Sequence, residues 1–274
     1  LIIKLYYTNA RLSTLFLQPF FCQSFFRLLF FLYNVLKYSY TIFSRKQYKK
    51  REEGCCMRNL RSLDSSERFL FYTGLVMAAS EIWKQWTLTF VLGDGTYNWW
   101  YFPFQLCSVP MYLLLLLPFF HASHIRRIFY TFLMDFSLLG GIAVFLDTSG
   151  MHYPFLPLTI HSYLWHLTLI AIGLFCGLSN ISDHTWHGFS SSVILFALLG
   201  GAATVINLTI GRTHDIDMFY ISPYYPMSQV IISDLTRRFP NPVRILCYLA
   251  VIVFGAFLLH LFWQRLFLLR SRKE

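Results

Sequence analysis

Residues Phe189–Ile210 have the sequence FSSSVILFALLGGAATVINLTI, a stretch that contains no charged side chain. A helix that crosses the hydrocarbon core of a bilayer needs roughly 20 mostly apolar residues. Strands are a poor alternative, because runs such as Met111–Phe120 lack the alternation of apolar and polar residues that a membrane barrel needs. The sequence therefore predicts an all-α polytopic membrane protein with a six-helix transmembrane bundle. The other five predicted spans are Arg68–Leu92, Tyr101–His121, Ile128–Leu146, Phe155–Leu178 and Val243–Phe262.

The composition of the chain agrees with this class. Of its 274 residues, 56% are hydrophobic and 13% are charged, whereas soluble domains have about 45–50% apolar and about 25% charged residues. The six cysteines show no metal-ligand spacing and no legible disulfide framework. We therefore predict no metal and no cofactor.

The net charge of +10 comes from clusters that mark the ends of the predicted helices. The loops 93–100 and 147–154 hold no Lys or Arg, and the long loop 211–242 holds only three. Because cytoplasmic loops carry an excess of Lys and Arg, both ends of the six-helix core are predicted to be cytoplasmic. The charge is a topology signal, and we predict no nucleic-acid partner. The clusters are Arg45–Arg51 with Arg58 and Arg61, then Arg126 and Arg127, and then Arg265, Arg270, Arg272 and Lys273.

The first 56 residues form a separate, atypical N-terminal extension, and residues 57–274 form the six-helix domain. Residues Leu12–Leu36 are rich in Phe but are interrupted by Gln18, Gln23 and Arg27. One hypothesis is that the natural start is Met57 and that the earlier residues are upstream sequence. The alternative is an extra hydrophobic helix that ends at the basic run before residue 52.

Several polar residues fall inside the predicted spans, where ionisable groups are costly and usually mark function. In the first span, Glu81, Lys84 and Gln85 share one helix face, so the carboxylate can pair with the ammonium. The alternative is a neutralised pair that only joins two helices. The remaining polar residues are Asp135 in the third span, His161 and His166 in the fourth, Asn207 in the fifth and His260 in the sixth.

Several of these residues lie at a similar depth. Counted from the expected outer helix ends, Cys107, Lys84 and His161 lie roughly 7–15 Å below the outer interface. This layer predicts a cavity that opens toward the outer leaflet, and the loop 211–242 is a candidate lid. His161 and His166 differ in direction by roughly 140° on a straight helix, so they do not point at one site without a bend.

A nucleophilic thiol needs a base, and histidine is a suitable one. Cys107 as nucleophile with His166 as base is one interpretation of this layer. The alternative is that Cys107 is a small packing residue, as we expect for Cys176 and Cys247. The dipeptides Gly140-Gly141 and Gly200-Gly201 are typical of close helix packing.

The stretch Trp99–Cys107 (WWYFPFQLC) resembles the LPL-x-x-C signature of the bacterial YwaF-like membrane proteins. Asp135, Gly140-Gly141 and the run His161–His166 follow in the order that this group has. The group is similar to the eukaryotic transmembrane protein 164 family, and the resemblance covers about residues 57–262. The chain departs from the usual motif at Phe104 and Gln105.

The resemblance implies a multi-pass protein of the cell membrane that transfers acyl chains between phospholipids, so that membrane lipids are its partners. Cys107 matches the nucleophile and His166 the base, with His161 as the alternative base. Supporting or substrate-binding roles then fall to Glu81, Lys84, Gln85, Gln105, Asp135 and Asn207.

Two other functions remain open at this point. In a transporter or lipid-binding protein, Glu81, Lys84, Asp135 and the histidines would form an intramembrane polar path. In a structural subunit, the polar groups would serve assembly. An enzyme would lose all activity in Cys107→Ala, whereas a transporter would be affected more by Glu81→Gln or Asp135→Asn. The acyl donor, the acceptor and the oligomeric state are not specified by the sequence.

Overall fold

The computed structural model describes residues 64–120, 122–179 and 181–271. The chain divides into Leu1–Gly54 and Cys55–Glu274, and every described residue belongs to the second unit. The predicted N-terminal extension, its alternative as an extra helix and the proposed start at Met57 lie outside the described residues, as does His121.

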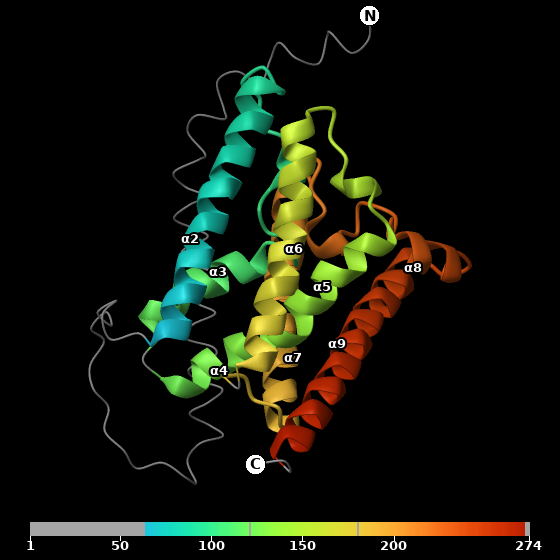
Figure 1. The fold of residues 1–274 in the computed structure, drawn as a ribbon. Helices are drawn as coiled ribbons and strands as arrows, with labels where there is room; N and C mark the ends of the chain where they lie inside the picture. The colour runs from blue at the N-terminus through green and yellow to red at the C-terminus, as the bar shows by residue number, and fades with distance from the viewer. Residues whose placement is uncertain (1–63, 121, 180, 272–274) are drawn as a thin grey trace, which may run out of the picture. The chain divides into compact units, whose positions relative to one another are not determined.

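Within the described residues the chain is helical and contains no strand (Figure 1). The α-helices are α2 (Ser65–Trp86), α3 (Val109–Leu116), α4 (Ser123–Phe132), α5 (Leu138–Ala143), α6 (Leu156–Leu178), α7 (Trp186–Ile210), α8 (Val230–Leu235) and α9 (Asn241–Ser271). Two π-helical turns continue them, η2 (Thr87–Val91) after α2 and η5 (Leu133–Ser137) between α4 and α5. Short 3-10 turns are η3 (Trp99–Tyr101), η4 (Leu117–Phe119), η6 (Val144–Leu146), η7 (Ser149–Met151) and η8 (Met218–Tyr220).

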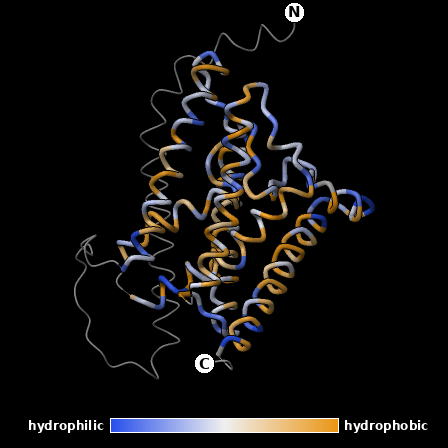
Figure 2. Tube along the Cα trace, viewed as in Figure 1, coloured by the Kyte–Doolittle hydropathy of each residue, from blue (hydrophilic) through white to orange (hydrophobic). Residues whose placement is uncertain are grey.

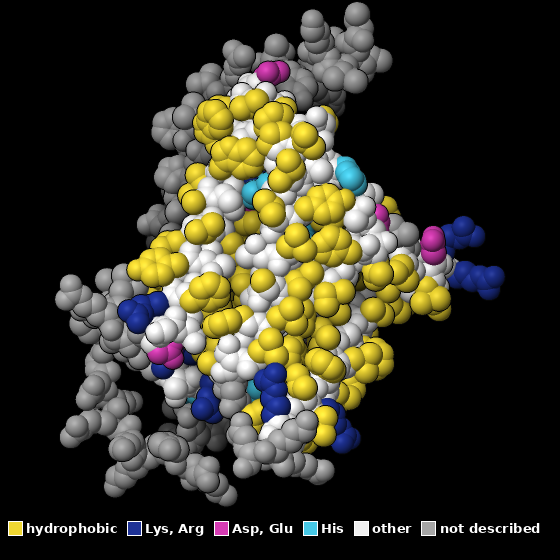
Figure 3. Space-filling view, viewed as in Figure 1, with side chains coloured by type: hydrophobic (Ala, Val, Ile, Leu, Met, Phe, Trp, Pro, Cys, Tyr) yellow, Lys and Arg dark blue, Asp and Glu magenta, His cyan; other side chains and the backbone are white. Residues whose placement is uncertain are grey.

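Four stretches are long and apolar enough to cross a membrane: Ser123–Leu146, Leu156–Leu178, Trp186–Ile210 and Asn241–Arg270. They correspond to the third, fourth, fifth and sixth predicted spans, which are confirmed as helices of spanning length. Figure 2 shows that α9 is hydrophobic along its middle and hydrophilic at both ends. In Figure 3, hydrophobic side chains cover the middle of the visible face, while Lys and Arg gather at its lower end and beside α8.

The first two predicted spans differ from these four. The helix α2 is long enough, but its charged side chains make it less apolar. The second predicted span, Tyr101–His121, is α-helical only from Val109 onward, and Val109–Phe119 is a shorter apolar helix. It covers about 16 Å, against a hydrocarbon core of about 30 Å. Pro103 lacks the N–H that a helix interior needs, whereas Pro110 lies in the first turn of α3, where this N–H is not required.

One end of the bundle is held by an ion pair between the first turns of α2 and α4. Asp64 caps α2 and accepts a hydrogen bond from the Glu67 N–H at 2.7 Å. The Glu67 carboxylate also pairs with Arg126 and accepts a hydrogen bond from Tyr130 at 3.3 Å. The start of α2 and the start of α4 therefore lie on the same side of the bundle.

The centre of the bundle is packed with aromatic rings. Phe136 stacks between Phe132 and Phe196 at centroid distances of 5.0 and 4.9 Å. The column continues to Phe219 in the loop after α7, which stacks on Phe104 at 5.9 Å. A large apolar core thus connects η5 and α7 with the two irregular segments on either side.

The predicted packing role of the paired glycines is met at one of four positions. A Cβ at Gly141 would lie 2.9 Å from Ile170 Cγ1 and 3.1 Å from its backbone N, so α5 and α6 approach closely there. A Cβ added at Gly140, Gly200 or Gly201 would have no neighbouring atom within 4 Å among the described residues, apart from the nearby backbone of its own helix.

Candidate functional site

The predicted pairing on α2 is confirmed. Lys84 Nζ lies 2.8 Å from Glu81 Oε1, and Gln85 Nε2 donates to the same oxygen at 2.7 Å. Glu81 is 4% exposed, and its second oxygen, Oε2, is buried without a hydrogen-bond partner among the described residues. A buried carboxylate oxygen without a partner is unfavourable, so this oxygen is available to a bound polar group or water.

Cys107 lies in the irregular segment Phe102–Ser108, before α3. Its backbone carbonyl accepts a hydrogen bond from the Trp165 indole at 3.0 Å, which holds this segment against α6 one residue away from His166. His166 Nδ1 donates to the carbonyl of Ser162 at 2.8 Å. Because a carbonyl only accepts, Nδ1 carries the proton, and Nε2 is left as the basic nitrogen. No hydrogen bond among the described residues joins Cys107 to His166.

His161 belongs to the same group of residues. Its imidazole lies between Trp83 and Trp165, with ring centroids at 5.8 and 5.6 Å, and its Nε2 is buried without a partner among the described residues. Lys84 is close enough to Cys107, His161 and His166 for its charge to act on all three. The fold thus gathers α2, the segment before α3 and α6 at one place.

The irregular segment before α3 uses polar side chains to satisfy its backbone. The carbonyl of Tyr101 accepts from Gln85 Nε2 at 2.6 Å, and that of Pro103 accepts from the Tyr112 hydroxyl at 2.6 Å. Together with the Trp165 bond, these contacts replace helical hydrogen bonds in a stretch where lipid offers none. Gln85 therefore has a structural role that explains its place among apolar residues.

The side-chain amides of Gln105 and Asn207 hold the loop after α7. Gln105 donates to the Asp217 carbonyl at 2.7 Å and accepts from the Phe219 N–H at 2.9 Å. Asn207, which is fully buried, donates to the Met218 carbonyl at 2.9 Å and accepts from the Met218 N–H at 2.7 Å. We call these four hydrogen bonds, from Gln105 and Asn207 to residues 217–219, the amide clamp.

Asp217 completes the held loop. Its carboxylate accepts from the Ser222 N–H at 2.8 Å and is 4% exposed. Burial raises the pKa of this carboxyl to about 6, although the bond from Ser222 acts in the opposite direction. The sequence marked this loop as a candidate lid, but nothing in it indicated that Gln105 and Asn207 would bind its backbone.

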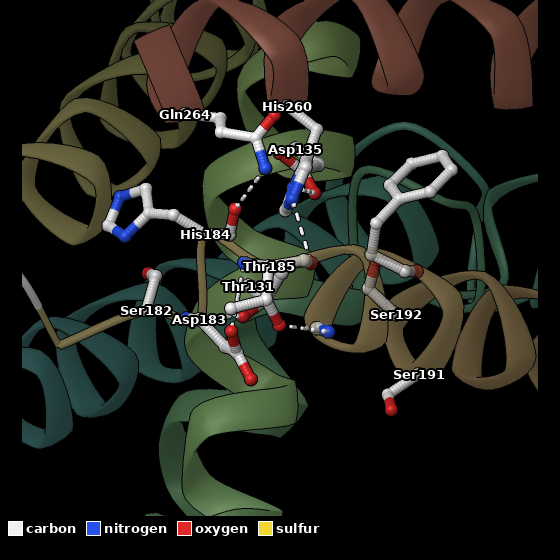
Figure 4. A network of polar contacts seen from close by, with 12 residues as sticks. Thr131, Asp135, Ser182, Asp183, His184, Thr185, Ser191, Ser192, His260 and Gln264 are labelled. Atoms are coloured by element: carbon white, nitrogen blue, oxygen red, sulfur yellow. Dashed lines mark hydrogen bonds and ion pairs between the residues drawn. The ribbon is translucent and has the colours of Figure 1, made fainter. Parts of the chain in front are cut away.

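Asp135 lies in a different place from Cys107. Its Oδ2 is 2.9 Å from Nδ1 of His260 on α9, and both residues are fully buried (Figure 4). The other imidazole nitrogen, Nε2, lies 3.1 Å from the carbonyl of Thr185. The partner of Asp135 is thus on another helix, 125 residues away in the chain.

The comparisons with known proteins found no matching family model, curated protein or solved structure. The resemblance to the YwaF-like proteins therefore remains a prediction.

Proposed function

We propose that this chain is a membrane-embedded lipid acyltransferase or hydrolase that uses Cys107 as nucleophile and His166 as base on phospholipid acyl chains. The proposal places six crossings in the cell membrane, with both ends of the core in the cytoplasm. The ion pair between Glu67 and Arg126 supports an even number of crossings before α4, because α2 and α4 begin on the same side. The second crossing is then the irregular segment Phe102–Ser108 followed by α3.

One observation carries the catalytic part of the proposal. The Trp165 indole bond to the Cys107 carbonyl fixes the segment that bears the thiol against the helix turn that bears His166. The bond from His166 Nδ1 to Ser162 leaves Nε2 to take a proton. A base so placed contributes typically 10²- to 10⁴-fold to a reaction, provided that it comes within hydrogen-bond reach once substrate binds.

The proposed reaction has two balanced steps. In the first, the Cys107 proton passes to His166 Nε2 and the sulfur attacks the ester carbonyl. The bond between the carbonyl carbon and the glycerol oxygen breaks, His166 returns its proton to that oxygen, and an acyl thioester remains with a free lysolipid. In the second, a hydroxyl of another lipid, or water, loses its proton to His166 and attacks the thioester, and the Cys107 sulfur leaves as the thiol.

The negative oxygen of each tetrahedral intermediate needs hydrogen-bond donors. The amides of Gln105 and Asn207, two of the predicted supporting residues, are occupied in the amide clamp. Lys84 is the remaining candidate, because its ammonium lies in the same group of residues and has three N–H donors. In this proposal, Glu81 holds Lys84 in place.

The test is the rate at which a lipid-tailed thiol electrophile labels the protein in liposomes. We expect rapid labelling of the wild type, loss of the rapid phase in Cys107→Ala and at least about tenfold slower labelling in His166→Ala. His161→Ala tests the alternative base, and Cys176→Ala is the matched control, because Cys176 is fully buried in α6 and has no catalytic role here. A labelled phospholipid should then leave an acyl group on the wild type that hydroxylamine releases. Labelling of Cys107 that is no faster than that of Cys176 and independent of His166 would refute the proposal.

A further inference from the structure

The pair formed by Asp135 and His260 is a second polar site in the bundle. Its hydrogen bonds lead to Thr185 and not to Glu81 or Lys84, so it is separate from the group around Cys107. Figure 4 shows the imidazole between Asp135 and the segment Asp183–Thr185, which leads into α7. The acyl chemistry does not explain the contacts that His260 makes with Asp135 and with Thr185.

The hydrogen bonds determine how many protons the pair holds. The Thr185 carbonyl only accepts, so His260 Nε2 carries a proton. The contact of His260 Nδ1 with Asp135 Oδ2 requires one more proton between the two atoms. Whether this proton lies on the nitrogen or on the oxygen, the pair as a whole is neutral, which is the favourable state for groups removed from water.

Two features connect this pair to proton exchange. Asp135 Oδ1 is buried without a partner among the described residues, so the carboxylate has an unused acceptor. Thr185, at the other end of the pair, is exposed. The imidazole therefore lies between an exposed residue and a fully buried carboxylate.

Loss of one proton has a defined structural consequence. If His260 gives its Nε2 proton to water, Nδ1 keeps a proton for Asp135, but the bond to Thr185 is lost and two lone pairs face each other. The helix α9 is held to the segment before α7 by this bond and by the bond from Gln264 Nε2 to the His184 carbonyl at 3.1 Å. The protonated imidazole thus makes one of the two side-chain hydrogen bonds that connect α9 to Asp183–Thr185 among the described residues, beside the stacking of Phe267 on His184 at a centroid distance of 5.0 Å.

We infer that the pair Asp135–His260 is a proton-binding site, and that the bound proton holds α9 to the segment that leads into α7. The ligand is a proton taken from water on the side of the membrane where Thr185 lies. The charged and titratable groups that face His260 are Asp135 from η5, and Asp183 and His184 from the segment before α7. The helix α5 carries no titratable side chain, α7 carries only the exposed His187, and α8 carries Asp234 beyond the opposite end of α9.

The first experiment measures the protonation state of His260 by NMR of ¹⁵N-labelled histidine, with the full chain in lipid nanodiscs. The His260 signal is identified by its absence in His260→Gln. It should shift as the pH rises, because the imidazole loses a proton. Asp135→Asn should change the proton concentration at half-titration by about tenfold or more, because it removes the charge next to the imidazole. If Asp135→Asn does not fold, Asp183→Asn should give a smaller change, since Asp183 acts on His260 without bonding to it.

The second measurement is amide exchange of residues 183–189 across the same pH range. The wild type should lose protection as His260 loses its proton, and His260→Gln should not show this step. Gln264→Ala is the matched control, because it removes the neighbouring contact without removing a titratable group. It should lower protection by a similar factor at every pH and leave the midpoint unchanged. A His260 signal that does not change with pH, or a pH step that persists in His260→Gln, would overturn the inference. Neither measurement depends on Cys107, so both are independent of the proposed acyl chemistry.

Discussion

The amide clamp makes a quantitative prediction about the loop after α7. Phe219 and Tyr220 both have φ of 57°, a left-handed backbone conformation that residues other than glycine rarely adopt. Each such residue costs on the order of 1–3 kcal/mol and persists only where the surroundings hold it. Asn207 supplies two of the holding contacts and is fully buried. We expect Asn207→Ala to release the loop.

The magnitude follows from what the two backbone groups of Met218 lose. Asn207→Ala leaves the Met218 N–H unsatisfied in a buried place, which costs about 1–3 kcal/mol. The Met218 carbonyl keeps the bond from the Ile221 N–H at 3.3 Å and loses only the bond from Asn207, which is worth about 0.5–1.5 kcal/mol. The closed loop should therefore lose at least about 1.5 kcal/mol relative to the open one, which is roughly a 12-fold change in the opening equilibrium. Amide exchange of residues 216–222 measures this equilibrium directly.

Matched variants make the prediction specific. Thr209→Val, on the exposed side of α7, should leave exchange in the loop unchanged. Gln105→Ala should act like Asn207→Ala, and the double variant should cost less than the sum, because the second amide has little left to hold once the loop is open. If exchange in Asn207→Ala rises less than about tenfold, or if the two single variants are additive, the amides do not form one clamp.

Two further predictions concern the same unit. Asp217 has a pKa of about 6 in the folded protein, above the value of about 3.9 in an unfolded chain. The folded state then binds the proton more tightly, so loop stability is greatest below about pH 4, falls as the pH rises to about 6 and is constant above it, with a total change of about 3 kcal/mol. Asp217→Asn should abolish this dependence in limited proteolysis across the pH range. Gly141→Ala should lower the midpoint of thermal unfolding through a cost of about 1–3 kcal/mol, because the new Cβ meets Ile170 Cγ1 at 2.9 Å and its backbone N at 3.1 Å. Gly200→Ala, where nothing lies within 4 Å among the described residues, should leave the midpoint unchanged or raise it.

Local patterns in the sequence predicted the local features of this fold. Hydrophobic length located the four spanning helices to within a few residues, except that α9 continues to Ser271, and helical spacing predicted the pairing of Glu81 with Lys84. The second predicted span is helical only over its second half, because hydropathy does not take account of hydrogen bonds. Residues 102–108 are apolar enough for a helix, yet Pro103 interrupts the backbone and side chains from elsewhere satisfy it.

The contacts between distant segments could not be predicted in this way. Gln105 binds residues 112 and 114 positions later in the chain, and Asp135 binds His260 125 positions later. A single sequence shows that these side chains are polar and roughly how deep they lie, but not which of them meet. The resemblance gave Asn207 a supporting role beside Cys107, whereas its amide binds the backbone of the loop after α7.

The polar residues of the bundle fall into two sets, those whose polar atoms are hydrogen-bonded and those that have a buried polar atom without a partner among the described residues. The amides of Gln85, Gln105 and Asn207 are used up by backbone groups, so their presence in an apolar region needs no ligand. Glu81 Oε2 and His161 Nε2 remain buried and unpartnered beside Lys84 among the described residues. Because such atoms are unfavourable unless something binds them, the best case for a substrate site lies at the group that also contains Cys107 and His166. The unsatisfied atoms point to this place independently of the family resemblance. Glu81→Gln tests it, since it should change the affinity for a lipid headgroup and leave the loop closed.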